Sequence, residues 1–176
     1  SARWAGRLIL DNPRADLLLA QLGVAATPSN AEGSQAGRGA LRVTLDGTQS
    51  QGFATDGALT LQEGYLSAAG NVVPGGTVAL PTISFKGTAI AETPDLGGLA
   101  ALLARPLADE ASGVAAKVNG DLSFDTVKGQ ATIEDFSGQL GSSIYSGRLA
   151  VKSCGPERPV ISGRLAIDQA NVASMQ

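Results

Sequence analysis

Several segments of the chain alternate between apolar and polar residues, which places one set of side chains on each face of a β-sheet. The alternation is clearest in residues 41–45, 59–61, 83–86, 122–125, 131–134, 148–152 and 164–168. In the last three of these segments the polar residues fall on one parity and the apolar residues on the other. This pattern predicts strands with one face exposed to solvent and one face buried.

Turn signals separate these segments at short intervals. They are Asp46-Gly47, Asp56-Gly57, Glu63-Gly64, Pro74-Gly75-Gly76, Asn119-Gly120 and Gly155-Pro156. The intervals are too short for parallel crossovers, which need about a dozen or more connecting residues. We therefore expect sequential strands to pair as antiparallel hairpins.

Two segments break the alternation and are predicted to be short helices. One covers residues 13–22, with Asn12 as the cap and Pro13 at the first helical position. The other covers residues 94 to about 104, with Thr93 as the cap. Each contains leucines four residues apart, which gives a narrow apolar stripe for docking on the sheet. Helices this short form only by packing.

The two helical segments also begin an internal repeat. Residues 6–13 match residues 87–94 at an offset of 81 (87 − 6). Downstream, residues 56–61 resemble residues 128–133 at an offset of 72 (129 − 57), so the first copy holds a longer loop, at residues 27–39. Chance similarity between glycine-rich hairpins is the alternative reading of this match.

The repeat divides the chain into a first copy at residues 1–82 and a second copy at residues 83–176. Each copy comprises a strand, a short helix and hairpins, and we expect the two to form one continuous structural unit. The predicted fold class is mainly β, a twisted antiparallel meander or groove-shaped sheet with two short helices.

Composition supports this class and narrows the function. Hydrophobic residues make up 43% of the 176 residues and charged residues 16%, which is enough apolar material to fold. Aromatics are only 4% and glycines number 23, as expected for short aliphatic elements with many reversals. The net charge is −3 and the basic residues are scattered, so no nucleic-acid partner is expected.

The sequence gives no pattern of a catalytic or metal site. It has no His, and its one cysteine, Cys154, has no Cys or His neighbour in sequence, so we expect no metal site and no cofactor. The adjacent acids Glu134-Asp135 and Asp109-Glu110 are interpreted as solvated charges, because neighbours on a strand point to opposite faces. We therefore expect a protein that is not an enzyme.

The C-terminal half carries three signals in a specific order. A short helix signal at residues 93–107 precedes the run Leu-Gly-Ser-Ser-Ile-Tyr-Ser-Gly-Arg-Leu at 140–149 and the run Glu-Arg-Pro-Val-Ile-Ser-Gly-Arg-Leu at 157–165. This order resembles the AsmA family of envelope proteins over roughly residues 85–173, and more loosely over residues 5–24.

The resemblance implies a protein of Gram-negative bacteria that is anchored in the inner membrane and lies mostly in the periplasm. It also implies a long curved sheet with an apolar concave face, which takes part in phospholipid transport between membranes and in outer-membrane assembly. No stretch here approaches the roughly 20 apolar residues of a membrane-spanning helix. We expect that the anchor and the neighbouring repeats lie outside this chain.

The resemblance implies phospholipid or another acyl-chain lipid as the ligand, and acyl chains bind by burial of apolar area. The alternating segments offer fourteen candidate lipid-binding residues: Leu41, Val43, Leu45, Leu59, Leu61, Ile83, Phe85, Leu122, Phe124, Ile133, Leu149, Val151, Leu165 and Ile167. One alternative is that these residues form an ordinary closed core. Another is a structural or interaction module of an envelope or secretion complex, whose strand edges pair with a neighbour.

Overall fold

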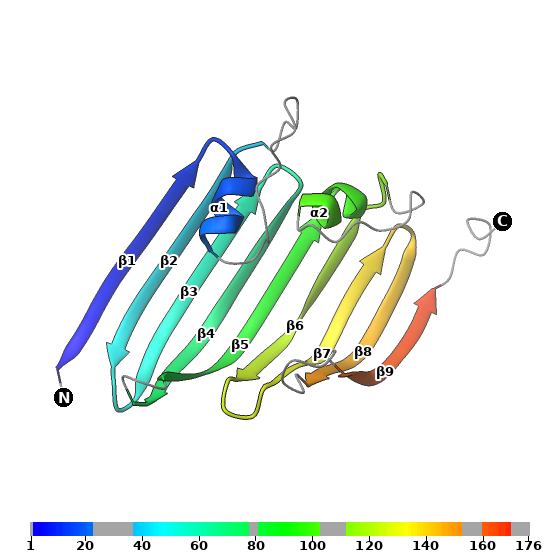
Figure 1. The fold of residues 1–176 in the computed structure, drawn as a ribbon. Helices are drawn as coiled ribbons and strands as arrows, with labels where there is room; N and C mark the ends of the chain where they lie inside the picture. The colour runs from blue at the N-terminus through cyan, green and yellow to red at the C-terminus, as the bar shows by residue number, and fades with distance from the viewer. Residues whose placement is uncertain (1, 23–36, 78–80, 103–111, 153–159, 170–176) are drawn as a thin grey trace.

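The computed structural model describes residues 2–22, 37–77, 81–102, 112–152 and 160–169 (Figure 1). Its strands are β1 (Arg3–Asn12), β2 (Gly39–Thr48), β3 (Gly52–Leu61), β4 (Gly64–Gly76), β5 (Pro81–Thr93), β6 (Ala116–Asp125), β7 (Gln130–Leu140), β8 (Ser143–Lys152) and β9 (Val160–Gln169). Its helices are α1 (Ala15–Gln21) and α2 (Leu96–Leu102).

All nine strands form one open sheet in the order of the sequence, from β1 to β9. Every neighbouring pair is antiparallel, so each strand pairs only with the strands before and after it in the chain. The predicted fold class, a mainly antiparallel meander with two short helices, is confirmed.

The strands are longer than the alternating segments, and three of the predicted turns are wrong. Asp46-Gly47, Asp56-Gly57 and Asn119-Gly120 lie inside β2, β3 and β6. At Gly47 the reason is close approach of the neighbouring strand, because a Cβ there would lie 2.2 Å from the carbonyl oxygen of Gly52. Glycine in a strand interior often marks such an approach.

The other turn signals have mixed outcomes. Glu63 lies in the turn between β3 and β4, as predicted. Pro74-Gly75-Gly76 instead forms the last residues of β4, and Gly155-Pro156 lies outside the described residues.

Both helices are shorter than predicted, because the expected caps shape the turn before each helix. The side-chain oxygen of Asn12 accepts the backbone N–H of Arg14 at 2.9 Å, and α1 begins one residue later. Thr93 Oγ1 likewise accepts the N–H of Asp95 at 3.1 Å, and α2 then begins at Leu96. Residues 103–104, the predicted last turn of the second helix, lie outside the described residues.

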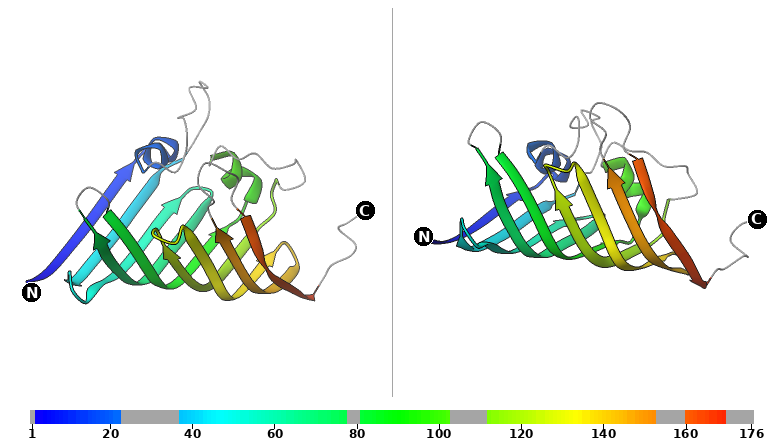
Figure 2. Two further views of the ribbon diagram at one scale, coloured as in Figure 1. Left: turned by 60° about the horizontal axis from the view of Figure 1, so that its bottom comes forward. Right: turned by 90° about the horizontal axis from the view of Figure 1, so that it is seen from below.

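The two helices lie on the same face of the sheet and near the same end of the strands (Figures 1 and 2). Ala15 and Leu19 of α1 are buried against Leu61 of β3. Leu99 and Leu102 of α2 pack against the same cluster. Helix docking therefore buries a small apolar core at one end of a sheet whose remaining length is uncovered by helices.

The two predicted repeats lie in one continuous sheet. In each, a strand leads into a helix, β1 into α1 and β5 into α2, and both helices lie on the same face. The predicted boundary between residues 82 and 83 falls inside β5. Among the described residues, no helix is long and apolar enough to cross a membrane.

Candidate functional site

The strand register divides the sheet into an apolar face and a polar face, since directly paired residues share a face and successive residues alternate. Leu59 pairs with Leu41 and Leu66, and Leu66 pairs with Ala91, which pairs with Val118. In β1, β4 and β6 the apolar face comprises the even-numbered residues within 4–10, 64–74 and 116–124. In β2, β3, β5, β8 and β9 it comprises the odd-numbered residues within 41–47, 53–61, 83–93, 143–151 and 161–167. In β7 it comprises Ala131, Ile133, Phe136, Gly138 and Leu140.

No residue of the apolar face is charged, and Thr55, Thr93, Ser143 and Tyr145 are its only hydroxyl side chains. The remaining strand positions form the polar face, which carries the charged residues. There Arg3 pairs with Asp46 at 2.6 Å, and this hydrogen bond lowers the pKa of Asp46. The charges are thus segregated from the apolar face along all nine strands.

The structure places all fourteen candidate lipid-binding residues on the apolar face. Many of them are not enclosed, because Leu45, Ile83, Val151, Leu165 and Ile167 remain 36–58% exposed. The alternative of an ordinary closed core fits the end beneath the helices, where Leu61 is buried. Phe85, near the start of β5, is also buried, but the five residues above are not.

A β-bulge keeps the apolar face continuous through β7. The register shifts between Ile133 and Phe136, and Asp135 adopts a positive φ of 48°. A Cβ on Gly120 would lie 2.8 Å from Ile133 Cγ2 and 2.9 Å from Phe136 Cβ, so both side chains lie beside Gly120 on the same face of the sheet. Because the bulge adds one residue, the Phe136 side chain lies on the apolar face although two acids, Glu134 and Asp135, separate it from Ile133.

An open apolar cavity of about 700 Å³ lies between the helices and this face. Leu19 of α1 and Leu96 and Leu99 of α2 line one side. Sheet residues from β3 to β9 line the other, among them Leu59, Leu61, Leu66, Ala91, Val118, Phe136, Leu140, Leu149 and Leu165. Its volume lies within the range of roughly 300–1,000 Å³ that is typical of small-molecule sites.

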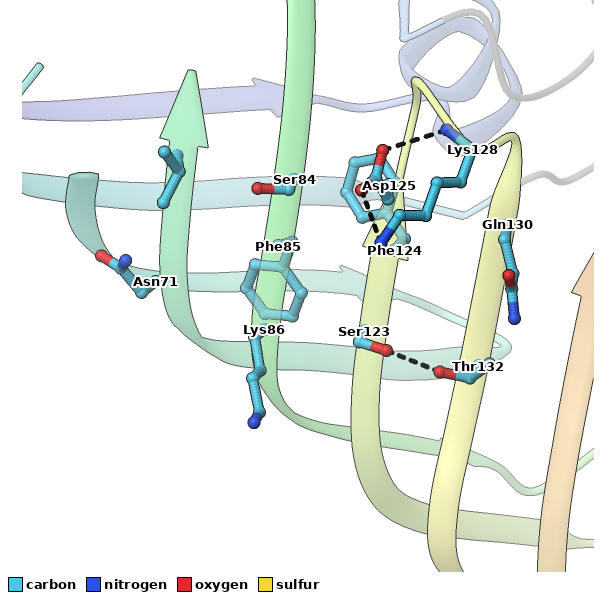
Figure 3. Close-up of a pocket in the computed structure, with 11 residues that line it drawn as sticks. Asn71, Ser84, Phe85, Lys86, Ser123, Phe124, Asp125, Lys128, Gln130 and Thr132 are labelled. Carbon is cyan, nitrogen blue, oxygen red and sulfur yellow. Dashed lines mark hydrogen bonds and ion pairs between the residues drawn. The ribbon is translucent and has the colours of Figure 1, made fainter. Parts of the chain in front are cut away.

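A smaller cavity of about 300 Å³ lies at β4 to β7 and is lined by polar side chains together with Val73, Phe85 and Phe124 (Figure 3). The hydroxyls of Ser123 and Thr132 hydrogen-bond to each other at 2.5 Å. Asp125 accepts the backbone N–H of Lys128, which lowers the pKa of its carboxyl, and lies 3.6 Å from the Lys128 ammonium. These polar groups satisfy one another, so the geometry describes a turn and not an acid–base pair.

The described residues contain no group of three or more His, Cys, Asp or Glu that could hold a metal ion. Ion pairs join the acids of the polar face to neighbouring bases, as Glu92 to Lys117 at 3.2 Å and Glu134 to Arg148 at 2.8 Å. This arrangement stabilises the polar face weakly, as exposed pairs do, and leaves the apolar cavity as the candidate functional site.

Sequence reasoning found four of the cavity residues, Leu59, Leu61, Leu149 and Leu165, and missed those on the helices and on β4. The leucine spacing in the helices indicated docking on a sheet, but not the strands on which they dock. No family model, curated protein or solved structure matches the chain.

Proposed function

We propose that the apolar face binds the acyl chains of lipids, and that the chain is a non-enzymatic, periplasmic part of an inner-membrane-anchored, AsmA-like protein. In this role the protein moves phospholipid between membranes and serves outer-membrane assembly. The observation that carries the proposal is an uncharged sheet face that extends over nine strands and stays largely open to solvent.

Exposure of this face favours a ligand over a simple core. Leu66 is 46% exposed and Leu165 is 58% exposed, although both line the cavity. Large contiguous apolar surface on a folded protein marks an interaction site. An acyl chain suits it, because each buried methylene contributes about 0.8 kcal/mol without requiring a directed bond.

The helices support a bound chain at one end of the strands. Leu19 is fully buried between α1 and the sheet, while Leu99 of α2 faces the same cavity. A chain in the cavity would contact helices on one side and sheet on the other, which increases the buried area per methylene. The envelope setting of the proposal rests on the resemblance at residues 93–165.

Native mass spectrometry of the gently purified protein, followed by lipid extraction, tests the proposal. We expect phospholipid in defined stoichiometry, or its uptake from added vesicles. Leu66→Asp should abolish binding because it places a charge on the apolar face inside the cavity, whereas Ser67→Asp, the next residue on the polar face, should not. Both positions are partly exposed, so both variants should remain folded by circular dichroism.

A folded protein that takes up no lipid would overturn the proposal and favour an interaction module. Equal loss of binding in Leu66→Asp and Ser67→Asp would also contradict it, because the effect would then not depend on the face.

A further inference from the structure

The cavity beneath the helices contains one polar group that binding of an acyl chain alone leaves unexplained. Tyr145 of β8 lies on the apolar face and lines the cavity. Its side chain is partly exposed, and among the described residues its hydroxyl has no hydrogen-bond partner. A phenol hydroxyl that an apolar ligand covers loses its hydrogen bond to water, so it requires an acceptor on the ligand.

The other polar side chains that line the cavity are either satisfied or belong to the opposite face. Thr93 lies on the apolar face, and its Oγ1 donates to the carbonyl oxygen of Asp95 at 2.9 Å. Four residues that form one row across the polar face complete the polar lining: Tyr65, Glu92, Lys117 and Gln139. Among the described residues, Tyr145 therefore supplies the one unused donor on the apolar side of the cavity.

Packing explains the aromatic ring of Tyr145 but not its hydroxyl. Gly138 lies directly opposite on β7, and Gly147 is the next residue of β8 on the same face. An aromatic ring beside two glycines fills space that neither of them fills. A phenylalanine would do this equally well, so the hydroxyl is left for contact with a ligand.

The two ends of the cavity differ in their exposure to solvent. At β3, beneath α1, Leu19 and Leu61 are buried. On the side of β7 to β9, Leu140 is 40% exposed and Leu165 is 58% exposed. Tyr145 lies on this open side, where the polar end of a ligand stays hydrated while its apolar tail is buried.

We infer that Tyr145 selects ligands that carry an acyl carbonyl group and fixes their direction in the cavity. Its hydroxyl donates a hydrogen bond to the carbonyl oxygen, and the acyl chain extends from β8 toward β3. This path covers five strand spacings (8 − 3), about 24 Å along the sheet, which suits a long acyl chain. This role of Tyr145 rests on the proposed function, to which it adds the polar group and the direction of the ligand.

Displacement of a fluorescent apolar probe from the whole chain tests the selection. Methyl palmitate and palmitate carry the acyl carbonyl, whereas hexadecane offers a similar chain without it. We expect Tyr145→Phe to weaken binding of both acyl ligands about tenfold and not to weaken binding of hexadecane, because it removes only the donor. A loss confined to palmitate would support the hydrogen bond and identify the ligand as a free fatty acid.

Tyr65→Phe is the matched control for this experiment. It removes the same hydroxyl from the polar face of β4, so it should change none of the three affinities. Both variants keep the aromatic ring, and circular dichroism verifies that both are folded.

Fluorescence quenching in the Trp4→Phe background measures the direction of the chain. Leu140→Trp places the reporter near Tyr145, and Leu66→Trp places it on β4, toward the closed end of the cavity. A fatty acid brominated beside its carboxyl group should quench the first reporter more strongly, and one brominated near its methyl end should quench the second more strongly. Adding Tyr145→Phe should reduce this difference, because the ligand loses the bond that fixes its direction.

Three outcomes would overturn the inference. The first is a wild-type protein that takes up none of the ligands, which would overturn the proposed function as well. The second is a wild-type protein that binds acyl ligands but responds alike to Tyr145→Phe and Tyr65→Phe. The third is a quenching order that is absent or reversed. The last two would leave the proposed function standing.

Discussion

Gly70 of β4 and Gly87 of β5 lie directly opposite each other on the apolar face, with no room for a side chain on either. A Cβ on Gly70 would lie 2.6 Å from the Cα of Gly87 and 2.3 Å from the carbonyl oxygen of Lys86. A Cβ on Gly87 would lie 2.1 Å from the carbonyl oxygen of Ala69. The obstacles are backbone atoms, so a rotamer change cannot relieve them.

We expect Gly70→Ala to lower the free energy of unfolding by about 1–3 kcal/mol, as overpacking does, because the added methyl group must displace β5. Gly6→Ala is the matched control. Gly6 lies on the same face in β1 with nothing within 4 Å of its Cβ position, so its substitution should change stability by less than about 0.5 kcal/mol. Urea unfolding measures both, and equal effects would show that β4 and β5 do not approach as described.

The bulge at Asp135 predicts an unusual response to substitution. Because its φ is 48°, Asp135→Gly should maintain or raise stability by up to about 1 kcal/mol, whereas Asp135→Val should destabilise the protein. Deletion of Asp135 should be far more damaging, since it would turn Phe136, which is 5% exposed, toward the polar face. Thermal unfolding of the three variants checks this order, and a tolerated deletion would contradict the assigned register.

The ion pair at the start of α1 predicts a specific acid sensitivity. The Asp16 side chain is 7% exposed, and the hydrogen bond from Arg14, 2.5 Å away, lowers its pKa while burial opposes the shift. A carboxyl whose pKa is lower in the folded state stabilises the fold fully above its unfolded pKa of about 3.9. That stabilisation is lost as the pH falls through the lower, folded pKa.

Asp16→Asn removes this contribution and should cost about 1.5 kcal/mol at neutral pH. The difference between wild type and variant should shrink below about pH 4. Urea unfolding at pH 7 and at a series of acidic pH values measures it. A difference that stays constant down to about pH 2 would show that the carboxylate charge does not hold α1.

Trp4 is the only tryptophan, and it allows the position of a bound ligand to be measured. It lies on the apolar face of β1 and is 67% exposed, whereas the strands that line the cavity begin at β3. Brominated fatty acid should therefore quench Trp4 weakly. In the Trp4→Phe background, Leu66→Trp should be quenched strongly, because position 66 lines the cavity. Stronger quenching of Trp4 would place the ligand away from the helices.

The alternating segments identified the faces of the sheet because side-chain direction in a strand has a period of two. This is why Leu59 and Leu149, far apart in sequence, were both assigned to the apolar face. β4 was not predicted, since Ala68, Ala69 and Gly70 give little contrast between the two parities. Gly47 was misread as a turn because the close approach that requires it comes from a neighbouring strand and leaves no local signal.

The helix cover of the cavity could be predicted only in part. The caps and leucine spacing indicated two short helices, but the packing of Leu99 against the cluster that contains Leu19 depends on the register of the intervening strands. The sequence holds only a weak signal for the bulge at Asp135. Two acids in a row precede Phe136, in a segment where apolar and polar residues otherwise alternate.

The match between strand order and chain order has a consequence for how the molecule forms. Every strand pairs with its neighbour in the chain. The pairings of β1 with β2 and of β5 with β6 enclose a helix, and the other six close short loops that lose little chain entropy. Contacts this local favour fast folding for an all-β protein. During synthesis, each newly emerged strand meets an already ordered edge, and the sheet can grow strand by strand without waiting for the C-terminus.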